Sequence, residues 1–197
     1  MSKEYYRIDQ GQLPTDYPTH RHLGEFWEQL GRTVATYGFL EQVLGRAIFA
    51  LTATRRYAQD ELEQAYSDWP GQLERALSDP LGGLIDAYGN ALRNYHKLPV
   101  SNLDQLVDDL RQSAQLRNVL CHGAWQVPDA NGKSVPLFVD RKQRIFATSI
   151  DVAYLQQVRA QVACLACEII NSIGSIGLQF PGSGGPGESI LQPSLAS

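Results

Sequence analysis

LDQLVDDLRQSAQLRNVLCHG, residues 103–123, is the stretch that decides the fold of this chain. Within it, one set of side chains recurs every three or four residues, which is the period of one face of an α-helix. Asn102 and Asp104 suit the first turn of such a helix, and Gly123 suits its C-terminal end. The stripe runs through Leu103, Val107, Leu110, Ala114, Arg117 and Cys121.

The same period predicts helices on both sides of this stretch. The first is long, with Leu30, Val34, Tyr37, Glu41, Leu44, Ile48 and Leu51 on one stripe. The last carries Tyr154, Val158, Val162, Leu165, Ile169, Ile173 and Ile176 in the same way. The expected long helices span about 24–55, 79–98 and 151–176, with two short helices at 60–67 and after Pro70.

Between the last two long helices the pattern changes from helical to extended. Residues 124–127 and 135–139 flank a turn at 129–132, which is typical of a β-hairpin. Residues 144–148 add a third short strand. The predicted fold is therefore mainly α, an up-and-down helical bundle with a small antiparallel β-hairpin or meander inserted before the last long helix.

The domain organisation follows from these elements. Residues 1–22 are expected to be an irregular lead-in, residues 23–179 a helical domain with the β insertion at about 124–148, and residues 180–197 a flexible tail rich in Gly, Pro and Ser. His20 and His22, at the end of the lead-in, are expected to be solvated. With 197 residues and 43% hydrophobic side chains, the chain can bury a substantial core.

Composition limits the function classes. A net charge of -4 and a pI of about 5.5 exclude a broadly basic nucleic-acid surface. Any RNA contact must therefore be local, and the short basic turn Arg141–Arg144 is one place for it. No apolar stretch is long enough for a membrane span, so no membrane partner is expected.

The three cysteines argue against a metal centre and for a reducing compartment. Their number is odd and no secretory signal precedes them, which favours a cytoplasmic location. Cys164 and Cys167 have CxxC spacing, but they lie within an apolar helical pattern without a second pair. We expect these thiols, and that of Cys121, to pack in the core, and we expect neither a metal nor a cofactor.

Two charged residues, Glu41 and Arg117, interrupt the apolar stripes of their helices. An uncompensated buried charge costs on the order of several kcal/mol. One interpretation is a structural ion pair that aligns the two helices, and another is a polar functional site that contains both residues. A third is a wrong helical frame, in which one or both charges face solvent.

His122 lies at the end of the helix, five residues after Arg117. The negative end of the helix dipole favours a protonated imidazole, which suits proton transfer. On an ideal helix the two residues point about 140° apart, so the irregular helix end or a second subunit must bring them together. Asn118 is placed to bind a phosphate oxygen or to orient a neighbouring side chain. A histidine that only caps carbonyl groups is the alternative.

The run from Arg117-Asn118 to His122-Gly123 resembles the R-x4-6-H motif of HEPN-domain proteins. The first long helix, with Gly38-Phe39-Leu40-Glu41, is also similar to the opening helix of that superfamily. The resemblance covers seven residues of motif and the helical order of about residues 24–178. It implies a helical bundle that forms a homodimer, in which the two motifs face a shared cleft.

The resemblance also implies an activity, that of a metal-independent endoribonuclease that cleaves RNA through attack by the 2′-hydroxyl. Arg117 would hold the scissile phosphate, His122 would act as general base or acid, Asn118 would position one of them and Glu41 would orient Arg117 or His122. RNA, a cognate antitoxin or a nucleotidyltransferase-type protein are the partners that it implies. The alternative is a non-catalytic HEPN-like interaction module, such as an immunity, antitoxin or regulatory protein.

Overall fold

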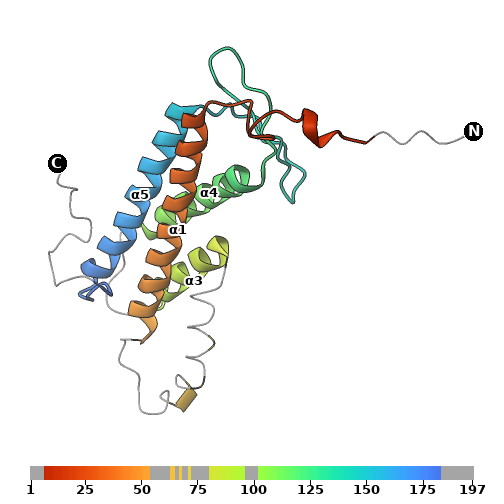
Figure 1. The fold of residues 1–197 in the computed structure, drawn as a ribbon. Helices are drawn as coiled ribbons and strands as arrows, with labels where there is room; N and C mark the ends of the chain where they lie inside the picture. The colour runs from red at the N-terminus through yellow and green to blue at the C-terminus, as the bar shows by residue number, and fades with distance from the viewer. Residues whose placement is uncertain are drawn as a thin grey trace, which may run out of the picture.

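The computed structural model describes residues 7–53, 63–64, 67, 71, 80–95 and 102–182 of the chain. The fold is mainly helical, as predicted (Figure 1). Its described elements are a short 3-10 helix η1 (Gln10–Gln12) and the helices α1 (Gly24–Ala53), α3 (Leu81–Arg93), α4 (Leu103–His122) and α5 (Val152–Ser175).

Most helix ends agree with the sequence signals. The carboxylate of Asp151 accepts a hydrogen bond of 2.7 Å from the backbone N–H of Tyr154, which caps α5. Asn102 precedes α4 in the left-handed conformation and makes no side-chain capping bond. Helix α3 ends at Arg93 rather than near Leu98. The two short helices predicted at 60–67 and after Pro70, and the tail beyond residue 182, lie largely outside the described residues.

Helices α1 and α5 form the centre of the fold, lying side by side and running in the same direction (Figure 1). Near their starts, the Thr33 hydroxyl lies 3.2 Å from the carbonyl oxygen of Leu155 and donates to it. Near their ends, the guanidinium of Arg46 lies against Gly182. The core between the helices includes Leu40, Leu44, Leu51, Leu155, Val162, Ile169 and Ile173, all essentially inaccessible to solvent.

Helix α4 lies across α1 and α5 instead of alongside them (Figure 1). Exposed ion pairs join it to α3, with Arg93 at 2.7 Å from Asp104 and Arg111 at 2.8 Å from Asp86. The buried residues of α4 include Val107 and Leu110 of the predicted stripe. The others lie outside that stripe, because α4 crosses the central pair, and they are Leu106, Ser113, Val119 and Leu120. The C-terminal positions of that stripe leave the core, so Arg117 is half-buried and Cys121 is exposed.

The prediction of a β-hairpin or meander at 124–148 was wrong. In the described structure this segment contains isolated antiparallel bridges, which join Ala124 to Leu137, Ser134 to Ile150 and Val139 to Ile145. The predicted turn does form, because the Asp129 carboxylate accepts hydrogen bonds from the N–H groups of Asn131 and Lys133. Pro128 and Pro136 have no N–H to donate, which interrupts a continuous ladder.

Gly123 joins α4 to this segment and admits no side chain. A Cβ atom built there would lie 2.6 Å from the carbonyl oxygen of Val119 and 2.7 Å from Cβ of Pro136. The backbone of Gly123 has an ordinary extended conformation, with φ of -70°. Glycine is therefore required here by close packing rather than by backbone strain, and this contact holds the segment against the end of α4.

Two further expectations about side-chain burial were wrong. Cys164 is exposed and Cys167 half-buried, because Cys164 lies about 100° around α5 from the buried Leu165. In the lead-in, the imidazole of His22 stacks on Phe26 with ring centroids 4.4 Å apart. Its Nε2 atom is buried without a hydrogen-bond partner among the described residues, and burial lowers the pKa of His22. The lead-in thus packs onto the start of α1 through aromatic contacts.

Candidate functional site

The predicted site residues lie on two different faces of α4. One face packs toward α1 and carries Arg117 and Ser113, although Ser113 and its partner Tyr37 also line the groove beside the other face. The other face borders this groove and carries Asn118 and His122. Within each face the two residues are four positions apart, so they lie one above the other.

On the packed face, a buried tyrosine links α1 to α4. The Tyr37 hydroxyl donates to the carbonyl oxygen of Ser113 at 3.0 Å and accepts from the Ser113 hydroxyl at 3.1 Å. Burial raises the pKa of Tyr37 to about 12, although the Ser113 hydrogen bond and the charge of Arg117 act in the opposite direction. The phenol is therefore neutral at physiological pH and fixes the position at which α4 crosses α1.

One helical turn further along both helices, Arg117 meets Glu41. The guanidinium and carboxylate are 3.6 Å apart, and each side chain is about one third exposed, at 32% and 31%. This distance is that of an ion pair but exceeds a good hydrogen bond, so N–H groups of Arg117 remain available to a further acceptor. The contact fits two of the three alternatives left open by the sequence, a structural ion pair and a polar site that contains both residues.

The groove lies between α4, the start of α5 and residues 138–146, and has a volume of about 980 Å³. Asn118 and His122 are among its lining residues, whereas Arg117 and Glu41 are not. The structure therefore brings the four predicted residues together as two pairs, Glu41 with Arg117 and Asn118 with His122. It does not place all four around one cavity within a single chain.

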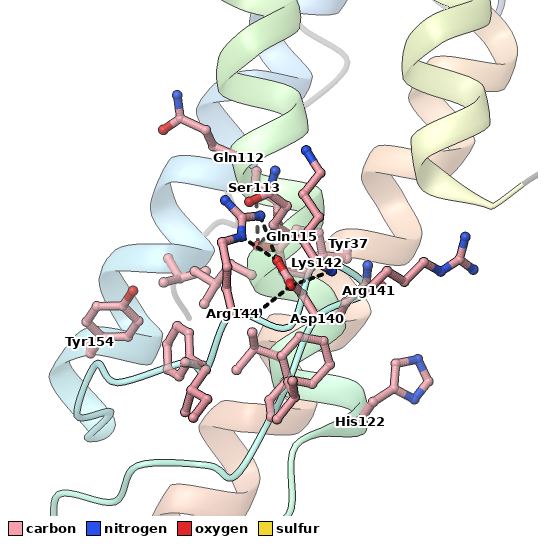
Figure 2. Close-up of a pocket in the computed structure, with 18 of the residues that line it drawn as sticks. Tyr37, Gln112, Ser113, Gln115, His122, Asp140, Arg141, Lys142, Arg144 and Tyr154 are labelled. Atoms are coloured by element: carbon pink, nitrogen blue, oxygen red, sulfur yellow. Dashed lines mark hydrogen bonds and ion pairs between the residues drawn. The ribbon is translucent and has the colours of Figure 1, made fainter.

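His122 is the last residue of α4 and its side chain is exposed. In Figure 2 its imidazole projects from the groove on the same side as the guanidinium of Arg141. The backbone around His122 is held by Gly123, whose N–H donates to the carbonyl oxygen of Val119 at 2.8 Å. An accessible imidazole on a well-held helix end, with a cation on the same side, is suited to proton transfer near an anion.

The basic turn of the groove is built around Asp140. Its carboxylate accepts from the N–H groups of Lys142 and Arg144, at 2.8 and 2.9 Å, and from the Arg144 guanidinium. These contacts, led by the hydrogen bond from the Arg144 backbone, hold the pKa of Asp140 below its usual value. Figure 2 shows Arg144 folded back onto Asp140 while Arg141 points outward. Arg141 and Lys142 are left without an ion-pair partner among the residues the structure describes.

The sequence did not predict several groove residues. Tyr154 was expected on the core stripe of α5, but it is half-buried and lines the groove. Gln112, Gln115 and Gln161 gave no signal, because exposed amides on helices are common. The sequence shows that residues 141–144 form a basic turn, but nothing local in it indicates that this turn faces α4.

Two other kinds of site are absent from the described part of the chain. No group of three His, Cys, Asp or Glu side chains there could hold a metal ion. No helix in the same residues has the length and apolar character needed to cross a lipid bilayer.

Compared with protein families, curated protein sequences and solved structures, the chain matches none of them. The resemblance to HEPN domains therefore stays a prediction that rests on residues 117–123 and on the order of the helices.

Proposed function

We propose that the protein is a cytoplasmic, metal-independent endoribonuclease of the HEPN type. The observation that carries the proposal is the exposed His122, at the C-terminal end of α4, beside a groove whose cations Arg141 and Lys142 have no ion-pair partner in the described residues. The overall charge of -4 agrees with RNA contact limited to this local basic region.

In the proposed reaction, His122 removes the proton of a ribose 2′-hydroxyl. The 2′-oxygen attacks the adjacent phosphorus, and the bond from phosphorus to the 5′-oxygen of the next nucleotide breaks. The leaving 5′-oxygen takes up a proton from water, which leaves a 2′,3′-cyclic phosphate and a 5′-hydroxyl. Arg117 stabilises the charge that grows on the phosphate oxygens, and Asn118 positions the phosphate or the imidazole.

Glu41 would keep Arg117 oriented for this role. A carboxylate 3.6 Å from the guanidinium restricts the long side chain without using all of its N–H donors. Because Arg117 faces α1 and His122 borders the groove, one chain does not present both to a single phosphate. We infer a homodimer in which the ends of two α4 helices meet, so that Arg117 of one copy works beside His122 of the other.

The test is cleavage of synthetic single-stranded RNA in the presence of a chelator. His122→Ala is expected to slow cleavage about 10²–10⁴-fold, and Arg117→Ala about 10²–10³-fold, with the helical content unchanged. Arg32→Ala is a matched control, because Arg32 is an exposed cation of α1 outside the groove. Cleavage should leave a cyclic phosphate, detected by mass spectrometry, and should stop when the ribose at the cut lacks its 2′-hydroxyl.

The proposal fails if pure protein in its native assembly leaves varied RNAs intact with and without metal. It also fails if His122→Ala and Arg32→Ala cleave equally fast, because the cleavage then comes from another group or from a contaminant.

A second candidate function is a non-catalytic interaction module, such as an immunity, antitoxin or regulatory protein. The observation in its favour is the Glu41–Arg117 ion pair on the packed face of α4. In this pair, Arg117, the residue predicted to hold the phosphate, already has a carboxylate partner. In that case Arg117 and Glu41 serve packing alone, and His122→Ala has no effect in any cellular assay. An antitoxin or a nucleotidyltransferase-type protein is the partner to look for if the protein is the ribonuclease.

A further inference from the structure

The two ends of the groove differ in chemistry. In Figure 2, Arg141 and His122 project on one side, and the phenol ring of Tyr154 lies on the opposite side. The first end is cationic and exposed. The second carries the aromatic ring of Tyr154, and amide side chains from α4 and α5 also line the groove. These two ends suit a ligand that carries negative charge at one end and a flat ring at the other.

The cationic end is available to a ligand because the acidic side chain of the described groove lining, Asp140, already has its own hydrogen-bond and ion-pair partners. Asp140 accepts hydrogen bonds from two backbone N–H groups and from the Arg144 guanidinium. Arg144 therefore neutralises Asp140, and the positive charge of Arg141 and Lys142 remains. An arginine with free N–H groups binds phosphate through two parallel hydrogen bonds.

The other end is suited to a nucleobase. Gln115 and Gln161 line the groove, and their amides make no hydrogen bond within the described residues. A carboxamide offers a donor and an acceptor side by side, the arrangement that matches the edge of adenine. The half-buried ring of Tyr154 gives a base a surface to stack on.

We propose that this groove binds one nucleotide of single-stranded RNA, with its phosphate at Arg141 and its base stacked on Tyr154, where a glutamine amide of the groove lining can bond to the edge of the base. The groove volume of about 980 Å³ is large enough for such a unit. It also lies within the range that is typical of small-molecule sites in proteins. This inference rests on the proposed function, and it assigns to Arg141 a substrate contact that the motif around Arg117 does not include.

The experiment is calorimetric titration at low salt with AMP, adenosine and ribose 5-phosphate. AMP should bind at least tenfold more tightly than adenosine and ribose 5-phosphate, because only AMP has both a phosphate and a base. Arg141→Ala should weaken AMP binding about tenfold and leave adenosine binding unchanged. Gln161→Ala should weaken AMP and adenosine binding equally, and Arg32→Ala should change neither.

Arg141 and Gln161 are exposed and make no hydrogen bond or ion pair in the described structure, so both variants should keep the fold. Tyr154→Leu is a further test of stacking, and it should weaken AMP and adenosine binding alike. If AMP binds no more tightly than ribose 5-phosphate, or if Arg141→Ala and Arg32→Ala behave alike, the inference is overturned.

RNA cleavage by the same preparations separates the two proposals. Cleavage that depends on His122, without AMP binding in the groove, overturns the nucleotide site and leaves the ribonuclease standing. AMP binding that depends on Arg141, without any RNA cleavage, overturns the ribonuclease and leaves the nucleotide site standing.

Discussion

Both faces of α4 carry polar side chains, but the two faces differ in whether these side chains have partners within the protein. On the face toward α1, Glu41 pairs with Arg117, and the buried Tyr37 and Ser113, which also line the groove, bond to each other. On the face toward the groove, Asn118 and His122 make no side-chain hydrogen bond or ion pair within the described residues. Polar groups removed from water need partners within the protein, whereas groups in an open groove stay hydrated and can exchange water for a ligand.

The two faces of α4 divide the predicted site. Positions four apart share a helix face, while neighbouring positions diverge by about 100°. Arg117 and Asn118 are adjacent in the motif but belong to different faces. The contact between two copies, or a ligand that spans both faces, would have to unite them.

The packed face should contribute much more to stability than the groove face. Leu110 is fully buried on the packed side, so Leu110→Ala is expected to lower the free energy of unfolding by about 2–5 kcal/mol. Gln112, two residues later, faces the groove. Gln112→Ala should therefore change the free energy of unfolding by only about 0.5 kcal/mol or less. Urea denaturation followed by circular dichroism measures both, and equal losses would show that the two faces are not distinct.

The buried phenol of Tyr37 makes the packed face sensitive to alkaline pH. Its pKa in the folded chain, about 12, lies above the ordinary 10.0, so the folded state holds this proton more tightly than the unfolded state. The resulting stability is complete below pH 10 and is lost as the pH rises toward 12. The loss is on the order of 3 kcal/mol.

The variant Tyr37→Phe separates the alkaline loss of stability caused by Tyr37 from any loss caused by the other tyrosines. The variant should be less stable at pH 8 by about 1 kcal/mol, because its hydrogen bonds to Ser113 are gone. Between pH 10 and 12 it should lose less stability than the wild-type protein. Denaturation curves at pH 8 and pH 11.5 test this, and parallel losses in the two proteins would contradict it.

The smallest effect on stability is expected for the interaction between Glu41 and Arg117 on the packed face. Both side chains of the Glu41–Arg117 pair are about one third exposed. A double-mutant cycle with Glu41→Ala and Arg117→Ala should therefore give a coupling energy of about 1 kcal/mol or less. Glu28 and Arg32, an exposed pair on α1 at 2.8 Å, provide a control cycle. The coupling expected for this control is about 0.3–0.5 kcal/mol.

The size of the coupling also separates the two candidate functions. A large loss on Glu41→Ala that Arg117→Ala restores would assign the pair to packing and favour the non-catalytic module. A small coupling leaves Arg117 free to serve a phosphate.

Much of the helical fold was predictable from the sequence. The carboxylate of Asp151 marks the start of α5, and Gly123 marks the end of α4, because capping depends on side chains within a few residues of the helix end. The hairpin prediction failed although its turn at Asp129 forms. Strand pairing needs partners across the chain, and Pro128 and Pro136 remove donors that a ladder would use.

The candidate site was only partly predictable. The meeting of Glu41 and Arg117 followed from the cost of leaving a charge alone within an apolar stripe. The groove did not follow, because Tyr154, Gln161 and Arg141 become neighbours of His122 only when α5 and residues 138–146 pack against α4.

By itself, the sequence determined where helices form and which of their positions carry chemistry, since a 3.6-residue period and capping act over a few residues. The direction in which α4 crosses α1, the separation of Arg117 from His122 and the existence of the groove were decided by the tertiary structure. These depend on how side chains distant in the chain fill space together, and a hydrophobic stripe indicates that a helix packs without specifying against what or at which angle.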